Sequence, residues 1–256
     1  MKHSFIDQYS DINSFIHRLD PRTKLLSCLA FILAVVLTPA GNWRLFAFYF
    51  LLIAALILLS RIPLLYVFKR SLVIIPFVLM VAVFIPFFKQ GQVAWSCNIG
   101  DWRIAVTWEG LLVLATVLIK SWLSILSLIL LSSSTRMAGL LEGMKRLGTP
   151  KIFILIVSFM YRYLFVLADQ MLRMRQARDS RNFGGSRRRQ FQTLGNMIGM
   201  FFIRSYERAE RIYAAMLARG YNGEIPVVQK LHFRSPDAYF SLALALLLVC
   251  PAILWW

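Results

Sequence analysis

Two arginines in this chain each follow an alanine near the end of a long basic segment. A guanidinium is a planar fork of N–H donors that can grip a carboxylate through two parallel hydrogen bonds. This chemistry suits an arginine tip that docks into an acidic groove of a partner. For any single arginine the alternative is that it complements the negative end of a helix dipole and faces water. The candidate residues of the two tips are Ala177, Arg178, Asp179, Ala218, Arg219 and Gly220.

Residues that could hold a metal or a nucleotide are scattered along the chain. The sequence contains no CxxC pair, HExxH motif, Cys/His cluster or Walker-type lysine loop. We therefore expect no cofactor, no metal centre and no catalytic group, and the chain is not predicted to be an enzyme. The cysteines and histidines behind this expectation are Cys28, Cys97, Cys250, His3, His17 and His232.

The composition is that of an integral membrane protein. Of the 256 residues, 59% are hydrophobic, the mean hydropathy is +0.64, and the net charge is +17. Five apolar runs approach the roughly 20 residues that a helix needs to cross a bilayer. Pro76 and Pro86 predict a kink in the third run. The predicted spans are Leu25–Ala40, Trp43–Ser60, Ser71–Phe88, Gly110–Leu131 and Ala238–Trp256.

A sixth apolar run, Ile152–Ala168, is interrupted by Arg162. Placing an arginine at the centre of a bilayer costs roughly 2.5–3.5 kcal/mol on insertion scales. This run is therefore predicted to be a helix at the membrane surface. The fold class that follows is an all-α integral membrane protein with about five transmembrane helices and three cytoplasmic or interfacial helices.

The distribution of charge predicts the topology. Residues 132–236 carry 18 of the 29 Lys and Arg residues but only six acidic ones. Basic loops stay in the cytoplasm, so four preceding spans place the N-terminus on the same side and the C-terminus outside. The predicted organisation is an N-terminal arm with four spans over 1–131, a cytoplasmic region over 132–236 and a last span over 237–256. In the external loop, "WRIAVTW" predicts half of a short β-hairpin.

Three helices are predicted in the cytoplasmic region, over 136–147, 151–182 and 188–219. Thr135 is expected to cap the first helix, and Gly220 is the expected stop signal of the third. Both alanine–arginine pairs thus fall near the C-terminal ends of long helices. The last half of the third helix carries an apolar stripe at spacings of three and four, formed by Phe202, Tyr206, Ala209, Tyr213 and Met216.

Smaller features of this region also suit contacts between helices. Glu207 and Arg211 are expected to form an i, i+4 ion pair. Gly195 and Gly199 make a GxxxG pattern, which permits close approach of a second helix. Eight of the ten methionines lie in this region, which suits either a core or a surface that repacks against a moving partner.

Four stretches of the chain resemble the transmembrane (T) subunits of energy-coupling factor (ECF) transporters, in particular the CbiQ branch of cobalt uptake systems. These are "HRLDPRTKLL" (17–26), "SSSTRMAGLLEGMKRLGTP" (132–150), "MYRYLFVLADQMLRMRQARDSRNFG" (160–184) and "MLARGYNG" (216–223). The second Ala-Arg-Gly signature of the family is intact at Ala218-Arg219-Gly220. The first reads Ala177-Arg178-Asp179, with aspartate in place of glycine.

The resemblance implies a subunit that makes no chemical bond and binds no ATP. It would join two cytoplasmic ABC-type ATPases (CbiO-like) to a membrane-embedded capture subunit (CbiM-like, with a CbiN-like accessory). Arg178 and Arg219 would dock into one ATPase each, and ATP-driven closure would move the helix tips and release the captured ion inward. The location would be the inner (plasma) membrane of a prokaryote, in contact with lipid, and the ion cobalt(II), with nickel or a vitamin as alternatives.

A different class of function, a stand-alone ion permease, would depend on Lys120 in the middle of the fourth span. No acid lies in any other span, and a lysine would repel a cation. The simpler interpretation is that Lys120 reaches a backbone carbonyl or faces a polar seam. The run Arg187–Arg189 is interpreted as a solvated linker, and no nucleic acid partner is expected.

Overall fold

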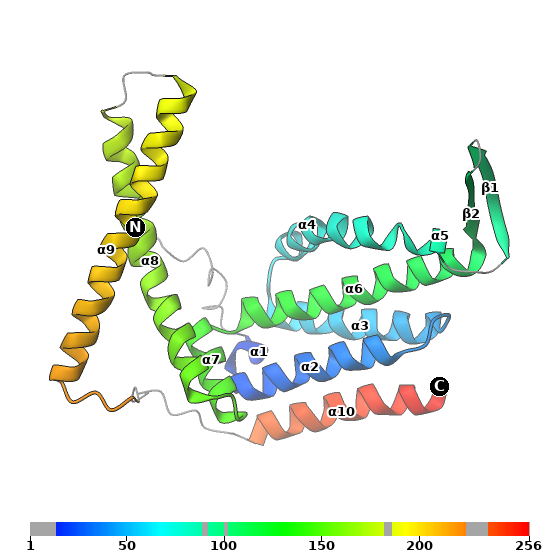
Figure 1. Cartoon of the computed structure of the whole chain (residues 1–256). Helices are drawn as coiled ribbons and strands as arrows, with labels where there is room; N and C mark the ends of the chain where they lie inside the picture. The colour runs from blue at the N-terminus through cyan, green and yellow to red at the C-terminus, as the bar shows by residue number, and fades with distance from the viewer. Residues whose placement is uncertain (1–13, 89–91, 100–101, 182–185, 224–234, 256) are drawn as a thin grey trace. The chain divides into compact units, whose positions relative to one another are not determined.

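The computed structural model describes residues 14–88, 92–99, 102–181, 186–223 and 235–255 (Figure 1). These residues are mainly helical and include one two-stranded hairpin, so the predicted all-α membrane fold class is confirmed. The chain separates into two compact units, which are described one after the other. One contains residues 148–230, and the other contains residues 2–147 together with 231–256.

The larger unit begins with a short helix, α1 (Phe15–Arg18), followed by the apolar helices α2 (Pro21–Leu37) and α3 (Trp43–Ser60). Helix α2 starts four residues before the predicted span, because Asp20 caps it and Pro21 occupies the first turn. The side chain of Asp20 accepts a hydrogen bond from the backbone N–H of Arg22 at 2.9 Å. Helix α3 matches the predicted second span.

The predicted third span, Ser71–Phe88, starts seven residues too late, and its predicted kink is a full break between two helices. The structure has a helix α4 over Leu64–Ala82 and a separate turn of helix, α5, over Ile85–Phe88. Pro76 lies inside α4, whereas the break at Val83 and Phe84 precedes Pro86. A proline clashes with the carbonyl four residues earlier, so Pro86 favours a break after Ala82, whereas α4 continues through Pro76.

A β-hairpin precedes the next long helix. Strand β1 (Val93–Ile99) pairs antiparallel with β2 (Trp102–Thr107), which confirms the half-hairpin predicted from "WRIAVTW". Residues 100 and 101, between the strands, lie outside the described residues. Helix α6 (Trp108–Ser134) follows at once, and the Thr107 side chain caps it by accepting a hydrogen bond from the Gly110 N–H at 3.2 Å.

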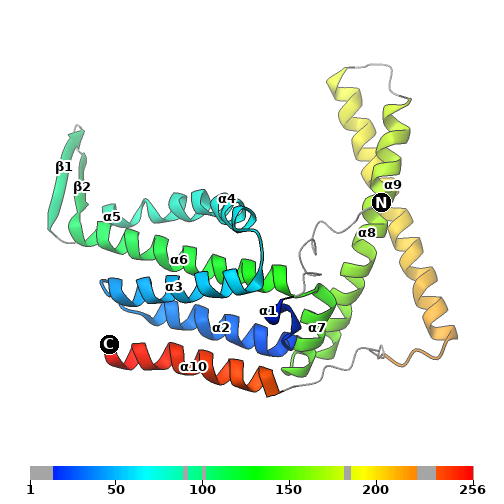
Figure 2. The ribbon, with the colours of Figure 1, turned by 180° about the vertical axis from the view of Figure 1, so that it is seen from behind.

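Helices α2, α3 and α6 and the last helix, α10 (Ser235–Trp255), enclose the main apolar core (Figure 2). Phe31 and Tyr49 meet edge to face in this core with ring centroids 5.9 Å apart, and Val35, Ile53 and Leu123 are almost fully buried beside them. The outward faces of the same helices are apolar and exposed, as expected of surfaces that face lipid. Trp256, assigned to the last span, lies outside the described residues.

Helix α7 (Met137–Arg146) packs against the start of α2 within the same unit. Arg136, not Thr135, stands at its N-cap, because Thr135 ends α6 in an extended conformation. Gly143 lies close against the start of α2: a Cβ atom there would be in van der Waals contact with the backbone nitrogen of Arg22 at 3.4 Å. A glycine-lined contact with the N-terminal arm therefore holds the first predicted cytoplasmic helix.

The smaller unit consists of two long helices, α8 (Lys151–Asp179) and α9 (Arg187–Ala218), which cross each other (Figure 1). At the crossing the Arg208 guanidinium donates a hydrogen bond to the side-chain oxygen of Gln170 at 3.1 Å. The predicted ion pair between Glu207 and Arg211 is confirmed at 3.9 Å. Within this unit nothing described lies within 4 Å of a Cβ atom built on Gly195, so the predicted GxxxG contact is not formed here.

By length and composition, four of the described helices could cross a membrane: α3, α4, α6 and α8. Residues 235–251 of α10 form a shorter apolar helix, and α2 is an apolar helix of 17 residues. The placement of α8 at the membrane surface stays a prediction, as does the extent of the cytoplasmic region, 132–236.

Candidate docking site at two helix ends

Arg219 stands at the C-terminal end of α9 as its C-cap residue. The next residue, Gly220, has a φ of 79°, a conformation that favours glycine. The Gly220 N–H donates to the Leu217 carbonyl at 2.9 Å, and the Tyr221 N–H donates to the Met216 carbonyl at 3.1 Å. This pair of bonds is a Schellman motif, so the predicted glycine stop is confirmed. The side chain of Arg219 is exposed and makes no ion pair with any described residue.

Arg178 lies in the last turn of α8 and has different surroundings. Helix α8 continues through Asp179, whose φ is not positive, and ends at Ser180, whose N–H donates to the Gln176 carbonyl at 3.0 Å. The Nε and Nη2 atoms of Arg178 donate to the same carboxylate oxygen of Asp179, at 2.9 and 2.6 Å. The aspartate thus leaves the helix end intact but pairs with the arginine.

The two arginine tips are far apart. Helix α8 ends where α9 begins, so the C-terminal ends of the two helices lie at opposite ends of the α8–α9 unit (Figure 1). A helix of 32 residues, the length of α9, is about 48 Å long. A distance of this order excludes a single small ligand that is held by both arginines, but it permits one protein partner at each tip.

An apolar groove lies between α8 and α9. It has a volume of about 440 Å³ and contains the apolar residues Phe159, Tyr163, Tyr213 and Met216. A wider cleft of about 720 Å³ shares Phe159, Tyr163 and Met216 with this groove and continues to Arg162 and Arg219. The predicted stripe on α9 is therefore a surface rather than a core, since Phe202 and Tyr206 are also exposed.

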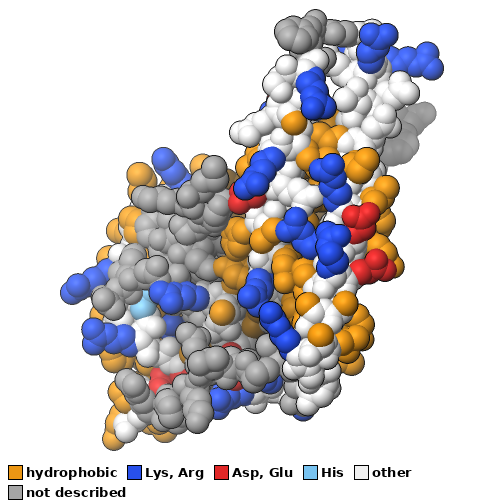
Figure 3. All heavy atoms as spheres, turned by 90° about the vertical axis from the view of Figure 1, so that its left-hand side faces the viewer, with side chains coloured by type: hydrophobic (Ala, Val, Ile, Leu, Met, Phe, Trp, Pro, Cys, Tyr) orange, Lys and Arg blue, Asp and Glu red, His pale blue; other side chains and the backbone are white. Residues whose placement is uncertain are grey.

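On the face drawn in Figure 3, basic side chains are spread along α8 and α9, and apolar side chains are exposed between them. Exposed apolar surface of this kind marks an interaction site with protein or membrane. The unit thus combines two basic ends, suited to acidic partners, with an apolar middle.

Lys120 has a structural role that the sequence allowed but could not specify. Its ammonium donates a hydrogen bond to the carbonyl of Val36 at 2.8 Å, near the C-terminal end of α2. A cation is favourable there because the last carbonyls of a helix carry partial negative charge. The interpretation that Lys120 reaches a backbone carbonyl is confirmed.

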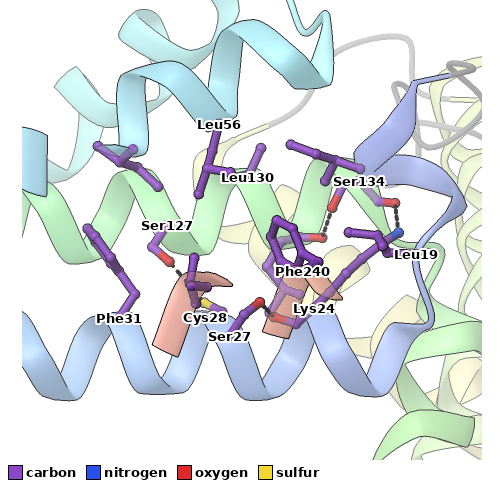
Figure 4. A pocket seen from close by; sticks show the side chains of 14 residues that line it. Leu19, Lys24, Ser27, Cys28, Phe31, Leu56, Ser127, Leu130, Ser134 and Phe240 are labelled. Atoms are coloured by element: carbon purple, nitrogen blue, oxygen red, sulfur yellow. Dashed lines mark hydrogen bonds between the residues drawn. The ribbon is translucent and has the colours of Figure 1, made fainter. Parts of the chain in front are cut away.

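A buried polar cluster at the N-terminal arm was missed by the sequence reasoning. The Lys24 ammonium donates to the carbonyl of Ser134 at 2.9 Å (Figure 4). It also donates to the carbonyl of His17 at 3.0 Å. The backbone N–H of Asp20 donates to the Asp237 carboxylate at 2.8 Å. The cluster joins α1, α2, α6 and α10 beside a cavity of about 40 Å³. The only hint in the sequence is the presence of Asp20 and Lys24 in "HRLDPRTKLL".

The described residues offer no site for a metal ion by the usual criterion of three or more clustered His, Cys, Asp or Glu side chains. Cys28 is buried and accepts a hydrogen bond from the Ser127 hydroxyl at 3.2 Å, whereas Cys250 is exposed. The side chain of Cys97 and the residues His3 and His232 lie outside the part that the structure describes.

Comparisons with known proteins relate the chain to a family of transport proteins. The family model described as "cobalt transport protein", CbiQ, matches residues 12–229. The chain is 31% identical to the energy-coupling factor transporter transmembrane protein EcfT of Brevibacillus brevis, over 98% of this chain and 97% of that protein. It is 29% identical to EcfT of Clostridium kluyveri, with the same coverage. It is 28% identical to a fused cobalt transport protein, CbiMQ, of Methanocorpusculum labreanum, over 83% of this chain and 36% of that protein.

The four long apolar helices of the described part of the chain are those of a membrane protein with several spans. The chain belongs to the CbiQ family of cobalt transport proteins, and it is a membrane component of the ECF transporter type. The resemblance noted in the sequence is thereby confirmed. The relatives reported above are named as transport proteins, which supports a transport role rather than an enzymatic one.

Proposed function

We propose that this chain couples two cytoplasmic ABC-type ATPases, each CbiO-like, to a membrane-embedded capture subunit and has no catalytic activity of its own. Arg178 and Arg219 each dock into an acidic groove on one ATPase, with Ala177 and Ala218 keeping the helix ends slim. The observation that carries the proposal is the placement of two arginine tips at opposite ends of one crossed helix pair. Two equivalent ATPases need two separate docking sites, and arginines about 48 Å apart can each bind one ATPase.

The apolar groove between α8 and α9 is the surface proposed to contact the capture subunit, which is CbiM-like with a CbiN-like accessory. Its lining side chains are mainly apolar, so a membrane-embedded partner suits it better than a soluble one. Because the wider cleft extends from these residues to Arg219, movement of that tip would reach the groove directly. When ATP binding closes the two ATPases together, the arginine tips would move with them, and the groove between α8 and α9 would change shape.

The substrate proposed is cobalt(II), carried into a prokaryotic cell across its inner membrane. The match to the cobalt transport family and the fused CbiMQ relative support this choice. The region 132–236 is proposed to be cytoplasmic because of its excess of basic residues. The ion itself would be bound by the capture subunit rather than by this chain.

The test is ATPase binding and cobalt uptake by the assembled complex. Arg178→Ala and Arg219→Ala should each weaken docking roughly ten- to hundredfold, since a hydrogen-bonded charge contributes about 1.5–3 kcal/mol. The double change should abolish uptake. Arg→Lys should rescue only in part, because lysine lacks the bidentate fork.

A matched control for these variants is Arg204→Ala, which removes an exposed arginine from the flank of α9. Arg208 is less suitable as a control, because its bond to Gln170 joins the two helices. The docking role is wrong if the tip variants bind the ATPase as tightly as the wild type, or if Arg204→Ala is equally damaging.

A further inference from the structure

The two arginine tips differ in one charged neighbour. At the α8 tip, one carboxylate oxygen of Asp179 accepts hydrogen bonds from both the Nε and the Nη2 atoms of Arg178, at 2.9 and 2.6 Å. The second oxygen of Asp179 lies 3.8 Å from the Nε atom of Arg175. The carboxylate is therefore shared between two arginines on the last turn of the helix.

The edge of Arg178 that Asp179 occupies is one that a partner would use. The Nε and Nη2 atoms form one of the two edges through which a guanidinium makes paired bonds to a carboxylate. While the intramolecular pair is formed, an incoming carboxylate can use that edge only by displacing Asp179. The Arg178 side chain is correspondingly only 29% exposed, although it lies at a helix end.

Among the described residues, the α9 tip has no such competitor. Gly220 follows Arg219 where Asp179 follows Arg178, and glycine has no side chain that could accept a bond. Arg219 is exposed, and its guanidinium has no ion pair among the described residues. Within the described part of the chain, Arg219 is therefore exposed without an ion pair, whereas Arg178 is already paired with Asp179.

We infer that Asp179 is an intramolecular competitor that weakens docking at the α8 tip. The two tips then engage their partners with unequal strength, and the Arg219 tip binds more tightly. This inference rests on the proposed docking role of the arginines. An exposed ion pair is a weak competitor, so the effect expected on the dissociation constant is about two- to fivefold.

The experiment measures binding of the ABC ATPase that co-purifies with the full chain, which is held in lipid nanodiscs. Arg219→Ala first restricts docking to the α8 tip. In that background, Asp179→Asn should lower the dissociation constant about two- to fivefold, because the neutral amide holds Arg178 less strongly. The gain should shrink as salt is added, since exposed charge pairs are screened.

The matched control places the same substitution where it should do nothing. With Arg178→Ala, docking depends on Arg219 alone, and Asp179→Asn should leave the dissociation constant unchanged. This control separates the pairing with Arg178 from any general effect of Asp179 on the stability of α8 or on the net charge of the α8–α9 unit.

The reciprocal change introduces a competitor at the other tip. In the Arg178→Ala background, Gly220→Asp should weaken binding about two- to fivefold relative to Gly220→Asn. Asparagine and aspartate have the same shape and both tolerate the left-handed conformation found at this position. The comparison therefore isolates the charge.

The outcomes separate this inference from the proposed function. If Arg178→Ala does not weaken ATPase binding in the otherwise unchanged chain, both the docking role and the competitor are wrong. If Arg178→Ala weakens binding but Asp179→Asn leaves binding unchanged or weakens it, only the competitor is wrong. A loss on Asp179→Asn would show that Asp179 orients the arginine for its partner.

Discussion

The ammonium nitrogen of Lys24 lies 2.9 Å from the backbone carbonyl oxygen of Ser134, the last residue of α6. The two residues are 110 positions apart in the chain. The same ammonium bonds the His17 carbonyl, and Asp20 and Asp237 attract it electrostatically. A single buried lysine thus joins the N-terminal arm to the point where α6 ends and the connection to α7 begins.

Removing this ammonium should destabilise the larger unit. Lys24→Met keeps most of the length of the side chain, but it leaves two carbonyls without their donor and removes one of the two cations near Asp20. We expect the free energy of unfolding in detergent micelles to fall by about 1.5–3 kcal/mol. Lys69→Met is the control, since Lys69 is exposed on α4. Equal stability of the two variants would contradict the role of Lys24.

The contact of α7 with α2 predicts an effect of side-chain size at Gly143. A Cβ atom there would already contact the Arg22 nitrogen at 3.4 Å, so the larger side chain of Gly143→Leu should push against the start of α2. We expect a loss of about 1–3 kcal/mol in stability, together with reduced uptake by the complex. Gly195→Leu is the matched control on another helix, where nothing described lies within 4 Å of the added atom. The packing argument fails if both leucine variants behave alike.

Lys120 is predicted to be structural rather than part of an ion path. Lys120→Met removes the bond to the Val36 carbonyl and should cost about 1 kcal/mol of stability. Cobalt uptake by the assembled complex should persist, in contrast to the Arg178→Ala/Arg219→Ala double variant in the same assay. Loss of uptake in an intact Lys120→Met complex would indicate instead that Lys120 takes part in ion passage, as the stand-alone permease hypothesis requires.

The predicted topology places the start of α8 on the cytoplasmic side, although α8 is long and apolar enough to span a membrane. The test is a single cysteine at Met160, which is 61% exposed, in a chain with its three natural cysteines replaced. An impermeant maleimide should label it only after the cells are opened. Ala40→Cys should react from outside, as the predicted external end of the first span. External labelling at position 160 would show that α8 is a sixth span.

Features set within one or two turns of chain could be predicted from the sequence. The long apolar runs predicted helices, and the glycine after Arg219 predicted a helix stop, because few residues other than glycine adopt the conformation found at Gly220. The i, i+4 pair of Glu207 and Arg211 and the half-hairpin before α6 were also predictable, because each depends on residues close together in the sequence. The third span was predicted to start at Ser71 rather than at Leu64, because a run of apolar residues says little about where a helix begins.

Other features were decided only by the tertiary structure. Lys24 could have faced water or any of several carbonyls, and the packing of α2 against α6 selected Ser134. The bond between Arg208 and Gln170 likewise requires the crossing of α8 and α9, which no local pattern describes. Neighbouring residues constrain backbone conformation directly, whereas partners across helices depend on how the whole bundle fills its core. The sequence alone therefore predicted two arginines at helix ends. Only the folded chain distinguished Arg178, which pairs with Asp179, from Arg219, which has no ion pair among the described residues.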